Sequence, residues 1–297
     1  MTLPWEKVVL WGGRVSLDSS RHIYRAWSET LRKLGVSVAW VEDHPSSLEQ
    51  IQPGCLVFAY NIWGAHIGEA VPGVDYLLHN FDVSHPLIQT VAPERLVRLQ
   101  VYTNDVMGER WDEVRYWLAD GHVLFQPWGT SLLAEEFLDP VFNPAARDCA
   151  FVGALWDDGG LGNATTVPRV AELLRARGLT FTHLTQVHDD DMVAAVRSSR
   201  FAPAFAGPWQ VEHNYLPCRV FKNVSYGALA VTNVPKFRDL MPGVWDDDLA
   251  ILIDRVLRLK AHEYLDLVRE QQRVVSRFTF RESLEAVARA FEEARTC

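Results

Sequence analysis

The chain has 297 residues, which suits one large domain or two of ordinary size. Hydrophobic residues make up 48% of it and charged residues 23%, a composition typical of globular proteins with sizeable cores. The net charge of −9 argues against a broad nucleic-acid or anionic-membrane surface, because such surfaces are rich in Lys and Arg. A local basic pocket for a small phosphate ligand remains compatible with this charge.

The four cysteines show neither the close spacing of zinc ligands nor that of a disulfide framework. They are Cys55, Cys149, Cys218 and Cys297, and we interpret them as reduced thiols. No apolar run reaches membrane-spanning length, and residues 1–13 lack the charged-then-apolar order of a signal peptide. We therefore expect a cytoplasmic protein without a transmembrane segment.

Short apolar strands alternate with helices through the first half of the chain. The predicted strands cover residues 7–11, 36–41, 56–60, 76–78, 96–102 and 123–125, and a helix with an apolar stripe from Ile23 to Leu34 ends at Gly35. This alternation predicts a parallel sheet covered on both faces. Ligands of such sheets bind beyond the carboxyl ends of the strands, which here are the segments 12–20, 61–66, 79–85 and 103–105.

The pattern restarts after a turn-rich loop at residues 139–144. The elements expected next are a strand at 149–155, a glycine-rich loop at 157–163, a helix opened by Pro168 and a strand at 180–184. They are followed by a helix capped by Asp190 or Asp191 and an apolar run at 201–205. Towards the end of the chain we expect a helix at 249–257 and a final helix that begins with the capping box 279–282. The expected fold is α/β, with two Rossmann-like domains facing across a cleft. They cover residues 1–142 and 143–297, and whether the last helix crosses back to the first domain is left open.

Residues 216–233 read as a short helix, a glycine stop and a buried strand. Val220, Phe221 and Val224 recur at helical spacing, and Gly227 stands where a C-terminal cap belongs. Arg219 and Lys222 lie three residues apart near the N-terminal end of this helix, where unpaired N–H groups and the helix dipole favour anions. The pair therefore predicts a phosphate or diphosphate site, with two solvated surface cations as the alternative.

The second half resembles the C-terminal domain of GT-B glycosyltransferases, closest to the spore-maturation-protein-like branch of the group 1 transferases. The likeness covers roughly residues 149–291 and is carried by FVG at 151–153, by RVFKNVSYGALAVTN at 219–233 and by SRFTFRESLEAVARAF at 276–291. In the first half, LLHNFDVSHP at 77–86 looks like the strand-then-Asp segment of the family. The resemblance implies transfer of a sugar from a nucleoside-diphosphate-sugar donor to an unidentified hydroxyl acceptor.

One position departs from this family. Its members commonly carry a Glu that holds the donor ribose where this chain has Lys222. The run CRVFKN also looks like the donor-site helix of the α1,3-fucosyltransferases, which implies that Arg219, Lys222 and Asn223 serve the diphosphate and ribose. A non-catalytic nucleotide- or sugar-binding scaffold, a GT-B epimerase or phosphorylase, and a periplasmic-type sugar-binding protein remain the alternatives.

The remaining donor-site candidates lie around this helix. Gly153 would allow close backbone approach, or would only serve a tight bend. His213 stands just before the helix, and Trp209 could stack on the base or sugar, with core filling as its alternative. We expect no cofactor and no metal, since the acidic clusters 189–191 and 246–248 precede helices and read as caps.

An inverting transferase also needs a base for the acceptor hydroxyl. Asp82 is the first candidate, because it lies in the segment that resembles the family. Asp18 is the second, with helix capping as its alternative, and His66 is the third, with a hydrogen-bonding role in its loop as the alternative. A retaining transferase would need no such base. Nucleic acid is not an expected partner, and the oligomeric state is open.

Overall fold

The computed structural model describes residues 3–14, 19–60, 64–79, 81, 84–100, 122–157, 159–241 and 245–296. It divides into two compact units: Met1–Gln126 with Phe280–Cys297, and Pro127–Thr279. The predicted boundary at residue 143 differs from the two places where the chain passes between these units, which are after Gln126 and after Thr279. Residues 127–142 have little regular structure, and their backbone bonds the end of a helix in the second unit, with Leu138 N–H donating to Ser225 O at 2.9 Å.

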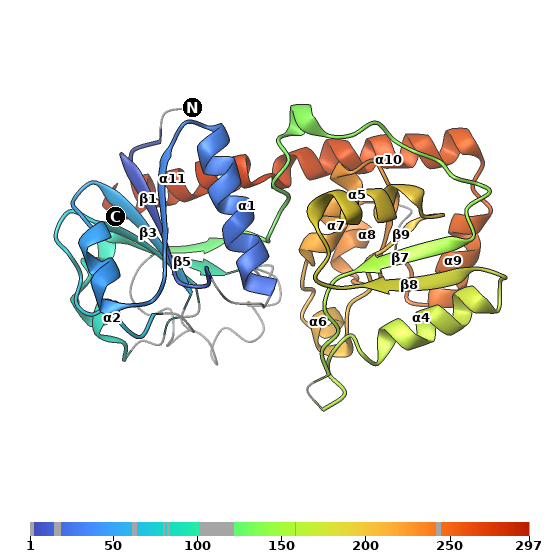
Figure 1. Cartoon of the computed structure of the whole chain (residues 1–297), viewed down its shortest axis with the longest axis horizontal. Helices are drawn as coiled ribbons and strands as arrows, with labels where there is room; N and C mark the ends of the chain where they lie inside the picture. The colour runs from blue at the N-terminus through green and yellow to red at the C-terminus, as the bar shows by residue number, and fades with distance from the viewer. Residues whose placement is uncertain are drawn as a thin grey trace. The chain divides into compact units, whose positions relative to one another are not determined.

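The first unit is built on a six-stranded sheet in which all paired strands run parallel (Figure 1). This confirms the predicted parallel sheet. Its strands, in spatial order, are β2 (Ser37–Val41), β1 (Lys7–Trp11), β3 (Cys55–Tyr60), β4 (Asp75–His79), β5 (Leu96–Gln100) and β6 (His122–Phe125).

Helices α1 (Ser19–Lys33) and α11 (Phe280–Thr296) pack together in this unit, and α11 also contacts β5 and β6. The ring of Trp27 on α1 lies 5.5 Å from Phe280 of α11 and 5.1 Å from Phe58 of β3. Neighbouring strand residues such as Val57 point the other way, into a cluster with Leu87 of α2 (Pro86–Thr90). The sheet is therefore covered on both faces, and the last helix does return to the first unit (Figure 1).

A buried carboxylate anchors this returning helix. Asp75, 3% exposed, accepts a hydrogen bond from Trp5 Nε1 at 2.7 Å and forms an ion pair with Arg95, whose Nη1 lies 2.9 Å away. Arg295 on α11 donates to the other side of the same carboxylate. Because the cationic partners come from distant parts of the sequence, Asp75 ties the end of the chain to the start of β4.

The second unit contains two parallel strand pairs, β7 (Asp148–Val152) with β8 (Thr180–Leu184) and β9 (Ala202–Pro203) with β10 (Ala230–Val231). Strands β7 and β9 lie side by side, since Arg200 N–H donates to Asp148 O at 2.8 Å just before β9 begins. The spatial order is therefore β8, β7, β9, β10. The accompanying helices are α4 (Thr166–Arg175), α5 (Asp189–Ser198), α6 (Pro208–Glu212), α7 (Cys218–Ser225), α8 (Lys236–Leu240), α9 (Leu249–Leu257) and α10 (Ala261–Val275).

The predicted helix, glycine and strand at residues 216–233 are present as α7, Gly227 and β10. Gly227 has φ +82° and ends the helix as expected. Side chains of α10 bond the outer edge of strand β10: the Tyr264 hydroxyl accepts from Leu229 N–H and Gln271 Oε1 accepts from Ala230 N–H, both at 3.2 Å. Helix α10 was not among the predicted elements.

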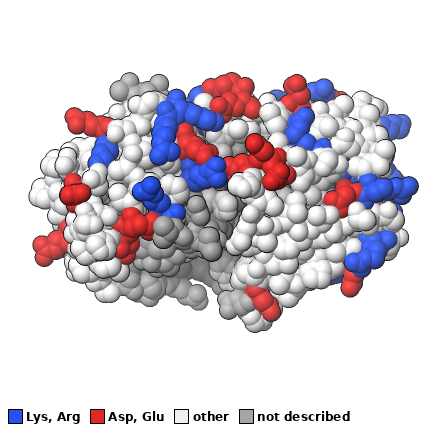
Figure 2. All heavy atoms as spheres, in the orientation of Figure 1, with Lys and Arg blue, Asp and Glu red and all other residues white. Residues whose placement is uncertain are grey.

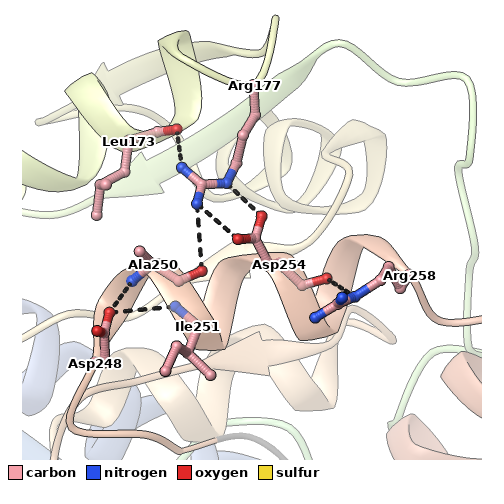
Figure 3. Close-up of polar contacts among 7 residues, drawn as sticks. All are labelled: Leu173, Arg177, Asp248, Ala250, Ile251, Asp254 and Arg258. Atoms are coloured by element: carbon pink, nitrogen blue, oxygen red, sulfur yellow. Dashed lines mark hydrogen bonds and ion pairs between the residues drawn. The ribbon is translucent and has the colours of Figure 1, made fainter.

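An ion pair joins the helices α4 and α9 (Figure 3). Arg177, just after α4, donates from Nε and Nη2 to the two carboxylate oxygens of Asp254, at 2.6 and 2.9 Å. Asp248 caps α9 by accepting from the N–H groups of Ala250 and Ile251, which confirms the interpretation of that acidic cluster. At α5 the predicted cap is wrong, because His188 occupies the cap position and the three aspartates form the first turn.

Short 3-10 turns complete the described chain: η1 (Pro45–Gln50), η3 (Pro93–Arg95), η5 (Ala134–Glu136) and η6 (Ser276–Phe278). Cys55, Cys149 and Cys218, the three cysteines that the structure describes, are free thiols. In the described ranges, no helix has both the length and the apolar character needed to cross a bilayer.

Candidate functional site

Arg219 and Gly153, two of the predicted donor residues, lie against each other at the first turn of α7. Strands β9 and β10 are parallel, so the chain must return between them, and α7 makes that return. Its first turn therefore lies at the carboxyl edge of the sheet, where ligands of such sheets bind. Arg219 reaches from this turn to the end of β7, where its Nε donates to Val152 O at 2.6 Å.

Arg219 is a half-buried cation. Its guanidinium carbon lies 4.0 Å from the centre of the Phe151 ring, in cation–π contact, and burial lowers the pKa of the guanidinium from its usual value. Among the described residues, no carboxylate lies within ion-pair distance of it. Charges that are partly withdrawn from water are stabilised by an opposite charge, so this cation is a candidate for binding an anion.

Gly153 lies directly against this guanidinium. Its φ is +144°, which favours glycine, and a Cβ at this position would come within 2.2 Å of Arg219 Nη2. The chain's own Arg219 takes up the space beside Gly153, and the expected close approach of the Gly153 backbone to a ligand stays a prediction. Gly153 N–H donates to Leu184 O at 2.9 Å, and Gly153 O lies 2.7 Å from Nε2 of His183 on β8.

The side chain of Asn163 bonds the backbone of the loop after Gly153. Asn163, 3% exposed, accepts from Trp156 N–H at 2.9 Å and donates to Ala154 O at 3.1 Å. In the described chain, the backbone N–H groups of Ala154 and Leu155 have no acceptor. Two backbone donors thus stand free just beyond the strand end to which Arg219 donates.

Trp209 and His213 lie on and just after α6. The two rings stack on each other, with centroids 4.4 Å apart and planes at 25°. His213 is 7% exposed, and its Nδ1 lies 2.7 Å from Trp209 O, which fixes Nδ1 as the protonated nitrogen. One face of Trp209 is therefore occupied by a ring of the chain itself.

Lys222 and Asn223 follow Arg219 on α7 but differ in placement. Lys222 is half-buried three residues further along the helix. Asn223 is 3% exposed, and its amide nitrogen lies 3.5 Å from Ala202 O, in the packing between α7 and β9. Its side chain thus packs in the core, and its predicted contact with the ribose stays a prediction.

Of the three predicted bases, Asp82 and Asp18 lie outside the described residues. His66 is described, with its side chain 47% exposed and its Nδ1 3.4 Å from Asp43 Oδ1. Asp43 also accepts from the backbone N–H groups of Ala65 and His66, each at 3.0 Å, and from Trp11 Nε1 at 2.8 Å. The loop that carries His66 is thus fixed at the carboxyl edge of the first sheet.

Asp43 and His183 were not among the predicted site residues. Both lie at carboxyl ends of strands, Asp43 two residues after β2 and His183 at the next-to-last position of β8. That position was the available signal, but which partner each residue meets depends on strand pairing. Across the described residues, no group of three or more His, Cys, Asp or Glu side chains is arranged to hold a metal ion.

No protein-family model and no curated protein matches the sequence. Solved structures do match. An α-glucosyltransferase in complex with UDP and a 13-mer DNA containing a HMU base aligns over 95% of this chain and 99% of its own, with a TM-score of 0.66 at 10% identity. The chain has the GT-B fold.

Two further structures agree with that assignment. The T4 phage BGT in complex with its UDP-glucose substrate aligns over 97% of this chain and 99% of its own, with a TM-score of 0.58 at 10% identity. The UDP-forming trehalose-phosphate synthase from Burkholderia xenovorans aligns over 99% of this chain and all of its own, also at 0.58 and 10%. The finer resemblances to the spore-maturation and fucosyltransferase branches stay predictions.

Proposed function

We propose that this chain is a glycosyltransferase that moves a sugar from a nucleoside-diphosphate-sugar donor to an acceptor hydroxyl. The observation that carries the proposal is the guanidinium of the half-buried Arg219, which has no carboxylate partner in the described chain and lies against Gly153 at the carboxyl edge of its sheet. Transfer from such a donor releases a diphosphate, and a preorganised cation stabilises the charge that develops on it.

The proposed donor site combines side chains with backbone donors. Arg219 supplies positive charge at the first turn of α7, where the helix dipole also favours an anion. Lys222, in the last turn of this eight-residue helix, is proposed to supply a second charge. The unpaired N–H groups of Ala154 and Leu155 supply further donors on the opposing loop. Trp209 and His213 are proposed to line the sugar or base end of the site, and no metal or other cofactor is required.

UDP is the first donor nucleotide to test, because the three similar structures are described with UDP, with UDP-glucose or as UDP-forming. The acceptor stays open. DNA accompanies UDP in one of those structures, but a net charge of −9 argues against a large phosphate-binding surface here. On the face that Figure 2 draws, Lys and Arg side chains are interspersed with Asp and Glu. We therefore favour a small-molecule or glycan hydroxyl.

Asp82, Asp18 and His66 remain the proposed bases, in that order. If Asp82 removes the acceptor proton, Asp82→Asn should suppress turnover while UDP affinity is retained. Turnover that survives this change would pass the role to Asp18 or His66, tested in the same way. Loss of affinity together with turnover would place Asp82 in donor binding instead.

Cys218 offers a direct test of the proposed site. It is the first residue of α7 and is partly exposed, whereas Cys55 and Cys149 are 4% and 0% exposed. UDP bound at Arg219 should slow alkylation of Cys218, measured peptide by peptide with mass spectrometry, and EDTA should not change the protection. An alkylation rate at Cys218 that is unchanged by UDP would contradict the proposal.

A non-catalytic nucleotide-binding protein is the second candidate. It is favoured by Lys222, which replaces the ribose-binding Glu of the resembled family. The two proposals separate in one assay, the release of UDP from UDP-glucose over hours with water or added sugars as acceptor. Tight UDP binding with no release from any tested donor sugar would support the scaffold.

A further inference from the structure

The imidazole of His183 makes a contact that the proposed function does not yet use. Its Nε2 lies 2.7 Å from Gly153 O, and its ring lies 5.9 Å from the Phe151 ring, on which Arg219 stacks. A carbonyl oxygen only accepts, so Nε2 must carry the proton and donate. His183 thus donates to Gly153, the glycine that lies against the Arg219 guanidinium.

This hydrogen bond sets the direction of the next peptide group. Gly153 has φ +144°, and a glycine in this region is held in place by its surroundings. Its N–H donates to Leu184 O of β8, and its carbonyl accepts from His183, also on β8. Both polar groups of Gly153 therefore face β8.

In a trans peptide the carbonyl and the following N–H point in opposite directions, and no cis bond occurs among the described residues. Ala154 N–H therefore faces away from β8, toward the side where β9 lies. Val152 O faces that same side. Val152 and Ala154 are two residues apart, and the backbone groups of alternate strand residues point to the same side. Val152 O is the acceptor for Arg219 Nε. The unpaired Ala154 N–H and the Arg219 guanidinium thus converge on one side of the strand end.

We propose that His183 is a positioning residue of the donor site, which fixes the Gly153 peptide so that Ala154 N–H joins Arg219 in binding the donor diphosphate. The proposal rests on the proposed function. His183 itself lies on the opposite side of Gly153 from that anion and acts through the backbone. Its effect should therefore be confined to the phosphate groups of the ligand.

The test is calorimetry of UDP and of uridine, which lacks the phosphates. His183→Ala should weaken UDP binding about 3- to 10-fold, the range for one lost hydrogen bond, and leave uridine binding unchanged. His183→Gln retains an N–H donor at a similar reach and should restore UDP binding to within about twofold of the wild type. His188→Ala is the matched control, since His188 is an exposed histidine of the next loop whose side chain makes no cap bond.

The outcomes separate the two proposals. Wild-type protein that binds no UDP overturns the proposed function and this inference together. Wild-type binding with equal UDP affinity in His183→Ala overturns the inference alone, as does an equal loss for uridine and UDP. A second measurement needs no variant: ¹⁵N NMR of the wild type should find His183 protonated at Nε2, and the other tautomer would exclude the hydrogen bond.

Discussion

Replacing Gly153 with Ala tests the contact between the strand end and the half-buried cation. The new Cβ would meet Arg219 at Nη2 (2.2 Å), Cζ (3.0 Å) and Nε (3.1 Å), so the guanidinium must leave its place. A side chain at φ +144° costs about 1–3 kcal/mol, and loss of the charged hydrogen bond to Val152 O costs about 1.5–3 kcal/mol. We expect Gly153→Ala to lose about 3 kcal/mol of unfolding free energy, which lowers Tm by about 6–12 °C.

The same change should weaken UDP binding. If Arg219 contributes one charge-assisted contact, its displacement lowers UDP affinity about 10- to 150-fold. Gly178→Ala is the matched control, because Gly178 also has a positive φ of +73° but its Cβ would meet only Arg147 Nη1, at 3.8 Å. That variant should lose stability and keep its UDP affinity.

A double variant sharpens the test. With Arg219 already truncated, the clash disappears, so Gly153→Ala should cost less stability in Arg219→Ala than in the wild type, by about 1–2 kcal/mol of coupling. Urea unfolding measures the stabilities, and calorimetry measures UDP binding. If Gly153→Ala protein binds UDP like the wild type, or the stabilities are strictly additive, the new Cβ does not displace the Arg219 guanidinium.

Three further predictions concern stability and pH. The ion pair with Arg177 lowers the pKa of Asp254 in the folded protein. The stabilisation that this ion pair gives is therefore present above the ordinary Asp pKa and is lost as the pH falls toward the lowered pKa. The Tm difference between the wild type and Asp254→Asn should shrink below about pH 4. Asp75→Asn leaves two partly exposed arginines without their shared, buried carboxylate, and urea unfolding should show a loss of about 2 kcal/mol; an unchanged midpoint would remove Asp75 as an anchor of α11. Burial lowers the pKa of His79 to about 4, so the unfolded chain binds a proton that the folded chain refuses, and the wild type should lose stability between pH 6.5 and 4, by up to about 3 kcal/mol, more than His79→Gln does.

The central stretch was predictable because its signals are local. Val220, Phe221 and Val224 at helical spacing define α7, and Gly227 defines its end, so neither needs knowledge of the rest of the chain. The bonding of β10 was not predictable in the same way. Its outer edge is completed by Tyr264 of α10, which is a tertiary contact.

Helix α10 was missed although its buried side chains, Tyr264, Val268, Gln271 and Val275, recur at helical spacing. The polar Gln271 interrupts the apolar stripe, and its burial follows from bonding the backbone of β10, which the sequence does not reveal. The units of the structure divide the chain at places other than residue 143 for a related reason. Residues 127–142 belong to the second unit through backbone hydrogen bonds, which no side-chain periodicity reports.

Within the site, residue types were easier to predict than contacts. Arg219 and Gly153 were each chosen for the donor site, but their contact with each other follows from the pairing of β7 with its neighbours and from the return path of α7. For Asn223, too, the residue type did not reveal the contact that its side chain makes. Four residues after Arg219, it lies on the buried side of the same helix, because packing against β9 decides its orientation.

The most direct test of the central claim is calorimetric titration of UDP into the wild type, Arg219→Ala and Arg238→Ala, with EDTA present. Arg238 is an exposed arginine that pairs with Asp239 on α8, so its loss controls for a general change in charge. We expect UDP to bind the wild type and Arg238→Ala equally and to bind Arg219→Ala at least tenfold more weakly. Absence of UDP binding by the wild type, or equal binding by Arg219→Ala, would contradict this claim.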